Sequence, residues 1–140
     1  MTESHASSAA SVEGLWAVVA DVTAWPRHLP TFRAVTHLSD SAVGGLGSRF
    51  EVRQPGLPVA TYEVTEWVPG ASFTWVARSP GVVTVARHAI TALETGSRLD
   101  LHVEWDGPLA PPLRLLVRRR AQRMIDLEAT TLARVARSCE

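Results

Sequence analysis

Hydrophobic and polar residues follow a helical period at both ends of the chain and a strand period between them. Near the start, Val12, Leu15, Trp16 and Val19 recur at helical spacing, and Ser11 before them is a favoured N-cap residue. The pattern predicts a short amphipathic helix that begins after Ser11 and packs its apolar stripe inward.

The stretch DVTAWPRHLP follows this helix, and its prolines predict a break. Trp25 precedes Pro26, and a residue before proline is disfavoured in the helical region, so the first helix should end soon after Asp21. Proline is well suited to the first position of a helix. We therefore expect a second short helix that Pro26 opens and Pro30 closes.

Between Arg33 and Asp106 the period changes to two, and turn signals interrupt it at VGGLG, QPGLP, VPGA, SPG and ETGS. The gaps are too short for crossover helices, so neighbouring strands should be antiparallel. The pattern predicts a meander of strands at about 33–39, 48–54, 60–67, 72–78, 82–92 and 98–105.

Two predicted hairpins indicate which face of these strands is buried. A two-residue turn at residues 80–81 pairs Phe73 with His88, and a turn around residues 95–96 pairs His88 with Val103. Both hairpins place the same large side chains on one face. These side chains are Phe73, Trp75, His88, Ile90, Leu99, Leu101, Val103 and Trp105.

The strand at 60–67 leaves two choices of inward face. Either Tyr62 and Val64 or Thr65 and Trp67 can point to the core, because both sets alternate with polar residues. The sequence does not decide between them.

From Pro111 to Arg137 the helical period returns, and a helix of about 26 residues would run roughly 39 Å, enough to cross a small sheet. Its expected apolar stripe consists of Leu113, Leu116, Val117, Ala121, Met124, Leu127, Thr131, Leu132 and Val135. The run RRRAQR at 118–123 lies mostly off this stripe and is interpreted as a solvated face, with Asp126 and Glu128 within pairing reach.

Four segments resemble the START-like, or SRPBCC, superfamily: LWAVVADVTAWPRHLP, GSRFEVRQPGLPVATYEVTEWVPGASFTW, SPGVVTVARH and EWDGPLAP. Within it they are most similar to the polyketide cyclase/dehydrase and lipid transport group. The resemblance implies an α+β helix-grip fold like that of Bet v 1. In this fold a curved antiparallel sheet of six or seven strands, with two short helices near the N-terminus, wraps a long C-terminal helix over a cavity.

The resemblance spans nearly the whole chain and implies one domain over residues 1–140, with 138–140 as a tail. The family's first strand falls on residues 1–8, where TESHASSA has almost no apolar alternation. We expect that strand to be a short edge strand, frayed or missing.

Composition narrows the classes of partner. With 14 basic and 14 acidic residues the formal net charge is zero, which favours neither nucleic acid nor an anionic membrane. The single cysteine, Cys139, allows no intrachain disulfide, and the histidines are not spaced as metal ligands. We expect a cytoplasmic protein, a monomer or weak dimer, without metal, cofactor or membrane insertion. The use of arginine without lysine is typical of a GC-rich bacterial genome.

The resemblance implies a cavity for an apolar or aromatic molecule. The expected ligand-binding residues are Trp25, His28, Arg53, Tyr62, Trp67, Phe73, Trp75, His88, Trp105 and Met124. His88 is the candidate catalytic residue, since its predicted position is inward, although a buried histidine bonded to a backbone carbonyl would explain it equally. The tryptophans could stack on a ligand or fill an ordinary core. Trp25 and His28 are candidates for a gate at the cavity mouth.

Three functions remain open at this point. The first is binding of a polyketide, lipid or other aromatic or apolar ligand. The second is an aromatase/cyclase-type enzyme, in which His88 acts as acid or base with Tyr62 or an arginine such as Arg53 polarising a poly-β-ketone. The third is a protein-interaction role like that of the superfamily's co-chaperone or toxin-like members, which a filled interior would favour.

Overall fold

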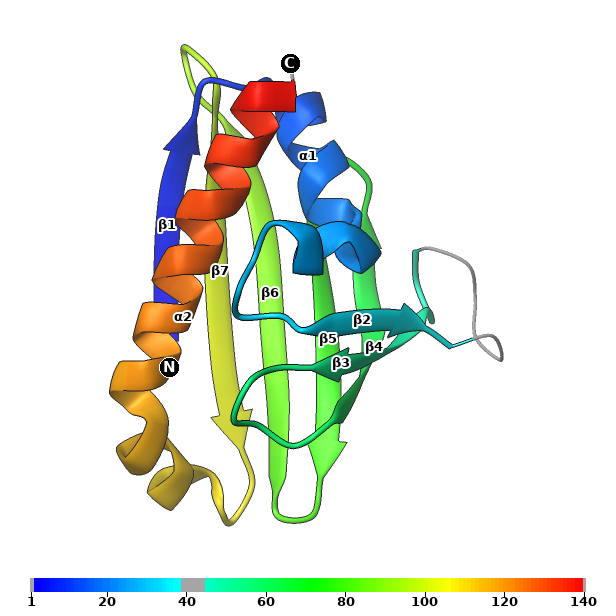
Figure 1. Cartoon of the computed structure of the whole chain (residues 1–140), viewed down its shortest axis with the longest axis vertical. Coiled ribbons are helices and arrows are strands. Elements are labelled where there is room, and N and C mark those ends of the chain that lie inside the picture. Colours follow the sequence, from blue (N-terminus) through cyan, green and yellow to red (C-terminus); the bar gives the residue numbers. More distant parts are fainter. Residues whose placement is uncertain (1, 39–44, 140) are drawn as a thin grey trace.

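The structure, a computed structural model, describes residues 2–38 and 45–139, with side chains up to residue 136. Its strands form one antiparallel sheet in the order β1-β7-β6-β5-β4-β3-β2, so the α+β helix-grip fold is confirmed with seven strands (Figure 1). The elements are β1 (Thr2–Ser8), α1 (Val12–Ala20), η1 (Val22–Arg27), β2 (Ala34–His37), β3 (Arg49–Arg53), β4 (Ala60–Val68), β5 (Ser72–Ser79), β6 (Val82–Ala92), β7 (Ser97–Asp106) and α2 (Ala110–Cys139).

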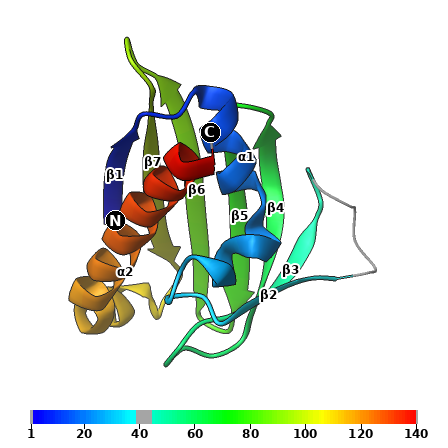
Figure 2. The same cartoon turned by 45° about the horizontal axis from the view of Figure 1, so that its top comes forward.

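The helices lie together on one side of the curved sheet. Strands β5, β6 and β7 run along the long axis of the view, whereas β2 and β3 turn across it (Figure 1). The same sheet seen from a tilted direction has α1, η1 and α2 on its concave side (Figure 2). This curvature creates the space in which the core and the cavity described below are found.

The N-terminal segment that carries little apolar alternation does form an edge strand. Strand β1 pairs antiparallel with β7 over its whole length, with Ser4 opposite Leu101. The Gln122 side chain donates a hydrogen bond to the Glu3 carbonyl at 2.7 Å, and Ser8 Oγ donates to the Ala133 carbonyl at 2.7 Å. Helix α2 therefore holds β1 at both ends through hydrogen bonds that need no apolar pattern.

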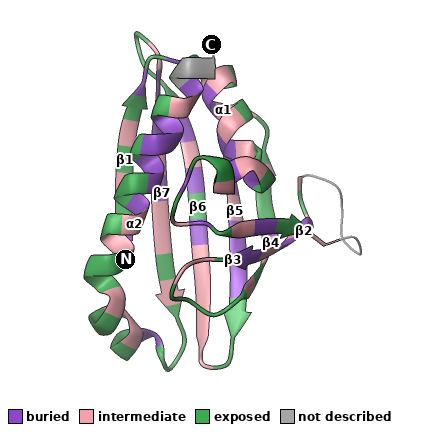
Figure 3. Cartoon of the chain, viewed as in Figure 1, coloured by how far each residue is buried: buried purple, intermediate pink, exposed green. Residues whose placement is uncertain are grey.

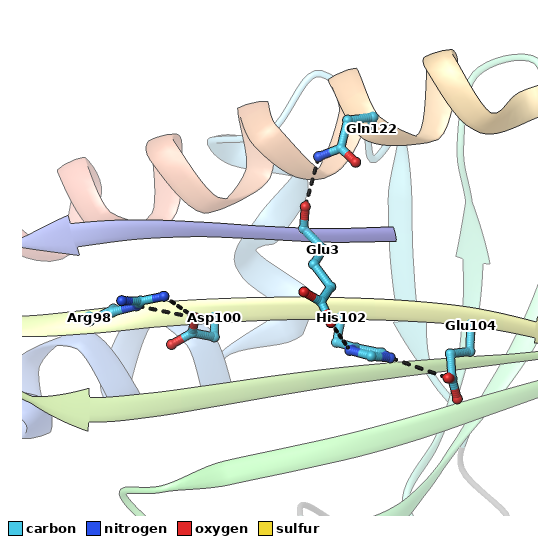
Figure 4. Close-up of polar contacts among 6 residues, drawn as sticks. All are labelled: Glu3, Arg98, Asp100, His102, Glu104 and Gln122. Atoms are coloured by element: carbon cyan, nitrogen blue, oxygen red, sulfur yellow. Dashed lines mark hydrogen bonds and ion pairs between the residues drawn. The ribbon is translucent and has the colours of Figure 1, made fainter. Parts of the chain in front are cut away.

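The outer face of β1 and β7 carries ion pairs. His102 lies between two carboxylates, with Nδ1 3.0 Å from Glu3 and Nε2 3.5 Å from Glu104 (Figure 4). Arg98 pairs with Asp100 at 2.9 Å on the same strand. These side chains are partly exposed to solvent, so each pair contributes little to stability, but together they mark this face as the outer one.

The first helix begins as predicted, since Ser11 Oγ accepts a hydrogen bond from the Gly14 N–H at 3.1 Å. The second prediction is wrong in its boundaries: η1 is a 3₁₀ helix over Val22–Arg27, with Pro26 inside it and not at its start. The 3₁₀ helix begins before Pro26 because Trp25, in its middle, is only 3% exposed and packs into the core. Its indole N–H also donates to the Val18 carbonyl at 3.3 Å.

The predicted pairing of β5 with β6 is confirmed, with Phe73 opposite His88. The predicted pairing of β6 with β7 is wrong by two residues, because His88 lies opposite Leu101 and not opposite Val103. Gly96 does not sit inside the two-residue turn. It follows the turn with φ +82°, a left-handed position that glycine adopts readily. Because the slip is even, the predicted inner face is preserved.

The undecided strand is interrupted by a β-bulge. Tyr62 pairs with Ala77 and Val64 with Trp75, but the register then shifts and Trp67 pairs with Phe73. A bulge inserts one residue and so reverses the alternation beyond it. Tyr62, Val64 and Trp67 consequently all face the core, which explains why the sequence supported both choices.

The buried stripe of α2 is rotated from the predicted one. Leu116 and Leu127, expected to face inward, are 83% and 42% exposed. The second half of the helix is packed tightly and the first half is not (Figure 3). The buried side chains of the second half are Ile125, Glu128, Ala129, Thr131, Leu132, Ala133 and Ala136.

The position of β1 can be tested at the turn beside it. A Cβ at Gly96 would collide with the Ser8 backbone carbonyl, whereas a Cβ at Gly70, which has a similar φ of +76°, would meet no atom within 4 Å. Gly70→Ala should cost roughly 1–2 kcal/mol through its left-handed backbone alone. Gly96→Ala should cost at least about 1 kcal/mol more, measured by urea unfolding. Equal costs would contradict the close approach of β1.

Candidate functional site

A cavity of about 360 Å³ lies between the sheet and α2. This volume is in the range of small-molecule sites. Most of its wall is apolar, and it is contributed by η1, β4 to β7, the loop before β4 and α2. Representative lining residues are Trp25, Phe32, Val59, Tyr62, Trp75, Ala86, His88, Val103, Trp105, Leu113, Val117, Ala121, Met124 and Glu128.

Aromatic rings form a continuous cluster at one side of the cavity. Phe73, which is fully buried, stacks on the His88 ring with centroids 4.1 Å apart and planes 14° apart. Trp25 lies 5.5 Å from both the Trp75 and His88 rings. Such edge and stacked contacts fix ring orientation. The cavity therefore has a rigid aromatic wall.

His88 is a buried polar group whose proton has a defined place. Its Nδ1 lies 3.3 Å from the Phe73 carbonyl, to which a neutral ring donates when Nδ1 carries the proton. Burial lowers the pKa of His88 to about 4, against a smaller opposite effect of the Phe73 carbonyl. The imidazole is therefore neutral at pH 7, and in that tautomer Nε2 is an acceptor.

Glu128 is the unexpected member of the cavity wall. Its side chain extends from α2 and is 8% exposed. The Thr31 hydroxyl donates a hydrogen bond to its Oε1 at 3.2 Å. Burial raises the pKa of Glu128 to about 8, and the Thr31 hydrogen bond only partly offsets this. The carboxyl is consequently protonated in most molecules at pH 7.

Tyr62 places a third proton-carrying group on the same cavity. Burial raises the pKa of its phenol to about 12, and the nearby Glu128 carboxyl raises it further in the same direction. The Tyr62 ring packs against Trp75 with centroids 4.8 Å apart. The hydroxyl is therefore a neutral hydrogen-bond donor and acceptor at any physiological pH.

Six of the predicted binding residues line the cavity. They are Trp25, Tyr62, Trp75, His88, Trp105 and Met124. Phe73 lies behind His88 and supports it without reaching the cavity. Trp67 packs on Trp16 at 5.1 Å and also belongs to the core.

Two predicted residues point elsewhere. His28 ends η1 with an exposed side chain, so it and buried Trp25 do not form a shared gate. Arg53 is exposed and pairs with Glu51 at 3.2 Å. The inward and outward positions of β3 alternate, and Val52 occupies the inward one. Neither residue lines the cavity.

Two charged residues of α2 were not predicted to line the cavity. Glu128 was assigned to pair with arginines on a solvated face, but it occupies the inward stripe one turn from Met124 and Leu132. Arg120 comes from the arginine run, lines the cavity and donates a hydrogen bond to the Pro55 carbonyl at 2.6 Å. The signal for Glu128 was its i+4 spacing from Met124 and to Leu132.

Within residues 2–38 and 45–139, no three histidine, cysteine, aspartate or glutamate residues gather as a metal site. None of the helices described there has an apolar stretch long enough to cross a membrane.

The buried carboxyl makes stability depend on pH. The folded-state pKa of Glu128 is raised from 4.5 to about 8, so its contribution is full below pH 4.5 and is lost as the pH rises toward 8. Glu128→Gln removes this loss. The difference in melting temperature, variant minus wild type, should therefore increase by at least about 5 °C as the pH is raised from 5 to 9.

The exposed neighbour Asp126 supplies a matched control, because Asp126→Asn removes the same charge one residue away from the cavity wall. It should not change the pH dependence of melting. A difference between Glu128→Gln and wild type that stays constant from pH 5 to pH 9 would show that the carboxyl is well hydrated.

Similarities to known proteins agree with this geometry. Norcoclaurine synthase from Thalictrum flavum, solved with dopamine and hydroxybenzaldehyde, has a TM-score of 0.75 at 14% identity, covering 99% of this chain and 86% of that chain. A hypothetical protein from Helicobacter pylori has a TM-score of 0.80 at 14% identity, covering 97% and 86%. The di-domain ARO/CYC StfQ from the steffimycin biosynthetic pathway has a TM-score of 0.68 at 13% identity, covering 97% and 48%.

These identities are low, so the structures establish the Bet v 1-like START/SRPBCC fold alone. Among curated proteins, none matches the chain in sequence. The family described as polyketide cyclase / dehydrase and lipid transport matches residues 1–137. The chain therefore belongs to the polyketide cyclase / dehydrase and lipid transport family.

Proposed function

We propose that the protein binds an aromatic or other apolar small molecule in the cavity between the sheet and α2. The main observation in support is the cavity itself, which has a volume of about 360 Å³ in a protein of 140 residues. Protein interiors are normally packed without voids of this size. An apolar ligand would recover the contacts that the unfilled wall lacks.

The polar groups would orient such a ligand. Glu128, Tyr62 and His88 each present a neutral hydrogen-bonding group at pH 7 within an otherwise apolar wall. A few fixed polar groups in an apolar pocket are the usual source of specificity for small molecules. A ligand with one polar end and one flat aromatic end matches this arrangement.

Two of the similar structures bear on the proposal. The norcoclaurine synthase structure holds dopamine and hydroxybenzaldehyde, both aromatic, and StfQ is an ARO/CYC protein of a biosynthetic pathway. The open interior gives no support to a purely protein-interaction role, which a filled interior would have favoured. We also propose that residues 1–140 act as a single domain, monomeric or weakly dimeric, in a bacterial cytoplasm.

Filling the cavity tests the proposal. Ala121 lines the cavity, whereas Leu115 on the same helix is 85% exposed. Ala121→Trp should weaken binding of a fluorescent, uncharged apolar probe such as N-phenyl-1-naphthylamine by at least about tenfold, because the indole takes the ligand's place. Leu115→Trp should leave the affinity within about twofold. Equal affinity in both variants would locate the probe outside the cavity and contradict the proposal.

Acid–base catalysis is a second candidate, favoured by the opposite pKa shifts of His88 and Glu128. The first group is a free base above about pH 4, and the second keeps its proton below about pH 8. Such a pair can remove a proton α to a ketone and return one to its oxygen, as a poly-β-ketone cyclisation requires. The rate should therefore be bell-shaped in pH between these two values.

Substitution of either residue tests this second candidate. His88→Ala or Glu128→Gln should lower turnover of a short poly-β-ketone by roughly 10²–10⁴-fold, and each should abolish one limb of the pH profile. Asp126→Asn should leave both turnover and profile unchanged. Turnover that survives in His88→Ala would overturn the mechanism without affecting the binding proposal.

A further inference from the structure

Glu128 is the one acidic side chain among the described residues that line the cavity. Its Oε1 accepts the Thr31 hydroxyl, and its Oε2 has no hydrogen-bond partner in the described part of the chain. A buried carboxyl is normally neutralised by a basic neighbour or bonded through both oxygens. In Glu128, the Oε2 atom is left without such a partner and can accept a hydrogen bond from a ligand.

The basic residues that line the cavity, Arg87, His102 and Arg120, are each bonded to a partner other than Glu128. Arg120, two turns earlier on α2, donates to the Pro55 carbonyl. Arg87 of β6 pairs with Glu66 at 3.7 Å, and His102 of β7 lies between Glu3 and Glu104 on the outer face (Figure 4). No ion pair therefore reaches Glu128 from the sheet or from its own helix within residues 2–38 and 45–136.

Apart from these basic residues, the ionisable groups that share the cavity with Glu128 carry no charge at pH 7. Tyr62 on β4 keeps its phenolic proton, and His88 on β6 is neutral. Thr31 donates a hydrogen bond, which favours the ionised carboxylate over the acid. When Glu128 ionises, it therefore becomes a negative group for which the described residues supply no positive partner.

The aromatic rings that line the same cavity suit a cation as well. Trp25, Tyr62 and Trp75 line the same cavity, and their rings lie within 4.8 to 5.5 Å of one another in neighbouring pairs. A cation over a tryptophan or tyrosine face is stabilised by the ring quadrupole, most strongly where water is excluded. A carboxylate ligand, by contrast, is not stabilised by the ring faces and would be repelled by Glu128 in its ionised form.

We propose that the ligand is an aromatic amine, whose ammonium group binds the Glu128 carboxylate while its ring packs against the aromatic wall that Trp25 and Trp75 form together. This inference rests on the proposed function, because it names the chemical class that the same cavity takes. An ammonium donates to the free Oε2 and supplies the missing charge. A neutral alcohol of the same shape supplies only a hydrogen bond.

Proton exchange is the signature of this binding mode. In the free protein most Glu128 carboxyls are protonated at pH 7, since the pKa is about 8. When an ammonium binds, the carboxyl ionises and its proton goes to the buffer, while the amine keeps its own protons. About 0.9 proton should be released per ligand at pH 7, and the release should fall toward zero as the pH passes 8.

Three indole compounds of nearly equal size separate the possibilities: tryptamine, tryptophol and indole-3-propionate, which end in an ammonium, a hydroxyl and a carboxylate. Titration calorimetry of the intact protein in two buffers with different protonation enthalpies gives both affinity and proton count. We expect tryptamine to bind at least about tenfold more tightly than tryptophol, and indole-3-propionate to bind most weakly.

Two variants assign the preference to Glu128. Glu128→Gln keeps the shape and a partner for Thr31 but cannot ionise, so it should reduce the preference for tryptamine over tryptophol to within about twofold and abolish proton release. Asp126→Asn, which removes an exposed charge from the same helix, should change neither quantity.

The outcomes distinguish this inference from the proposed function. If tryptophol binds wild type as tightly as tryptamine, or if tryptamine releases no proton at pH 7, the amine assignment is overturned while aromatic binding stands. If none of the three indoles binds, and the apolar probe does not bind either, the proposed function and this inference fail together.

Discussion

The unequal packing of α2 is the constraint on which the site depends. Its second half meets the sheet through small side chains, Ala129, Ala133 and Ala136, which let the helix approach closely and leave no space. Its first half has no buried side chain between Pro111 and Met124, so it covers the curved sheet without filling it. The second half of α2 thus packs against the core, and the first half covers the cavity.

The aromatic cluster meets the cavity at the boundary between these two regions. Trp25, held by the Val18 carbonyl, and Phe73, stacked on His88, belong to the packed core and also define the cavity wall. Buried polar groups are tolerated there because each has at least one partner: His88 the Phe73 carbonyl, Glu128 the Thr31 hydroxyl. The second oxygen of Glu128, Oε2, is the point at which we propose that the polar end of a ligand binds.

The sequence was sufficient for those features that local periodicity decides. The strands, the inner face with Trp75 and His88, and the Ser11 cap follow from alternation, turn chemistry and capping. The β6–β7 register was wrong because Gly96 follows its turn, and only pairing across strands reveals this. Edge strand β1 carries no apolar signal, since backbone pairing and α2 hold it.

The site was harder to predict for a related reason. A glutamate on a helix is normally solvated, so the pattern assigned Glu128 to the surface beside the arginine run. Only the rotation of the α2 stripe, with Leu116 and Leu127 turned outward, brings Glu128 into the cavity. That rotation depends on the shape of the curved sheet, which no local pattern encodes.

The most direct test of the account is the pKa of Glu128 itself, measured by ¹³C NMR titration of the glutamate side-chain carboxyls and assigned with the Glu128→Gln variant. A dry cavity wall predicts a pKa of about 8, well separated from the other glutamates. A value near 4.5 would mean that the carboxyl is hydrated, and it would contradict the site as described.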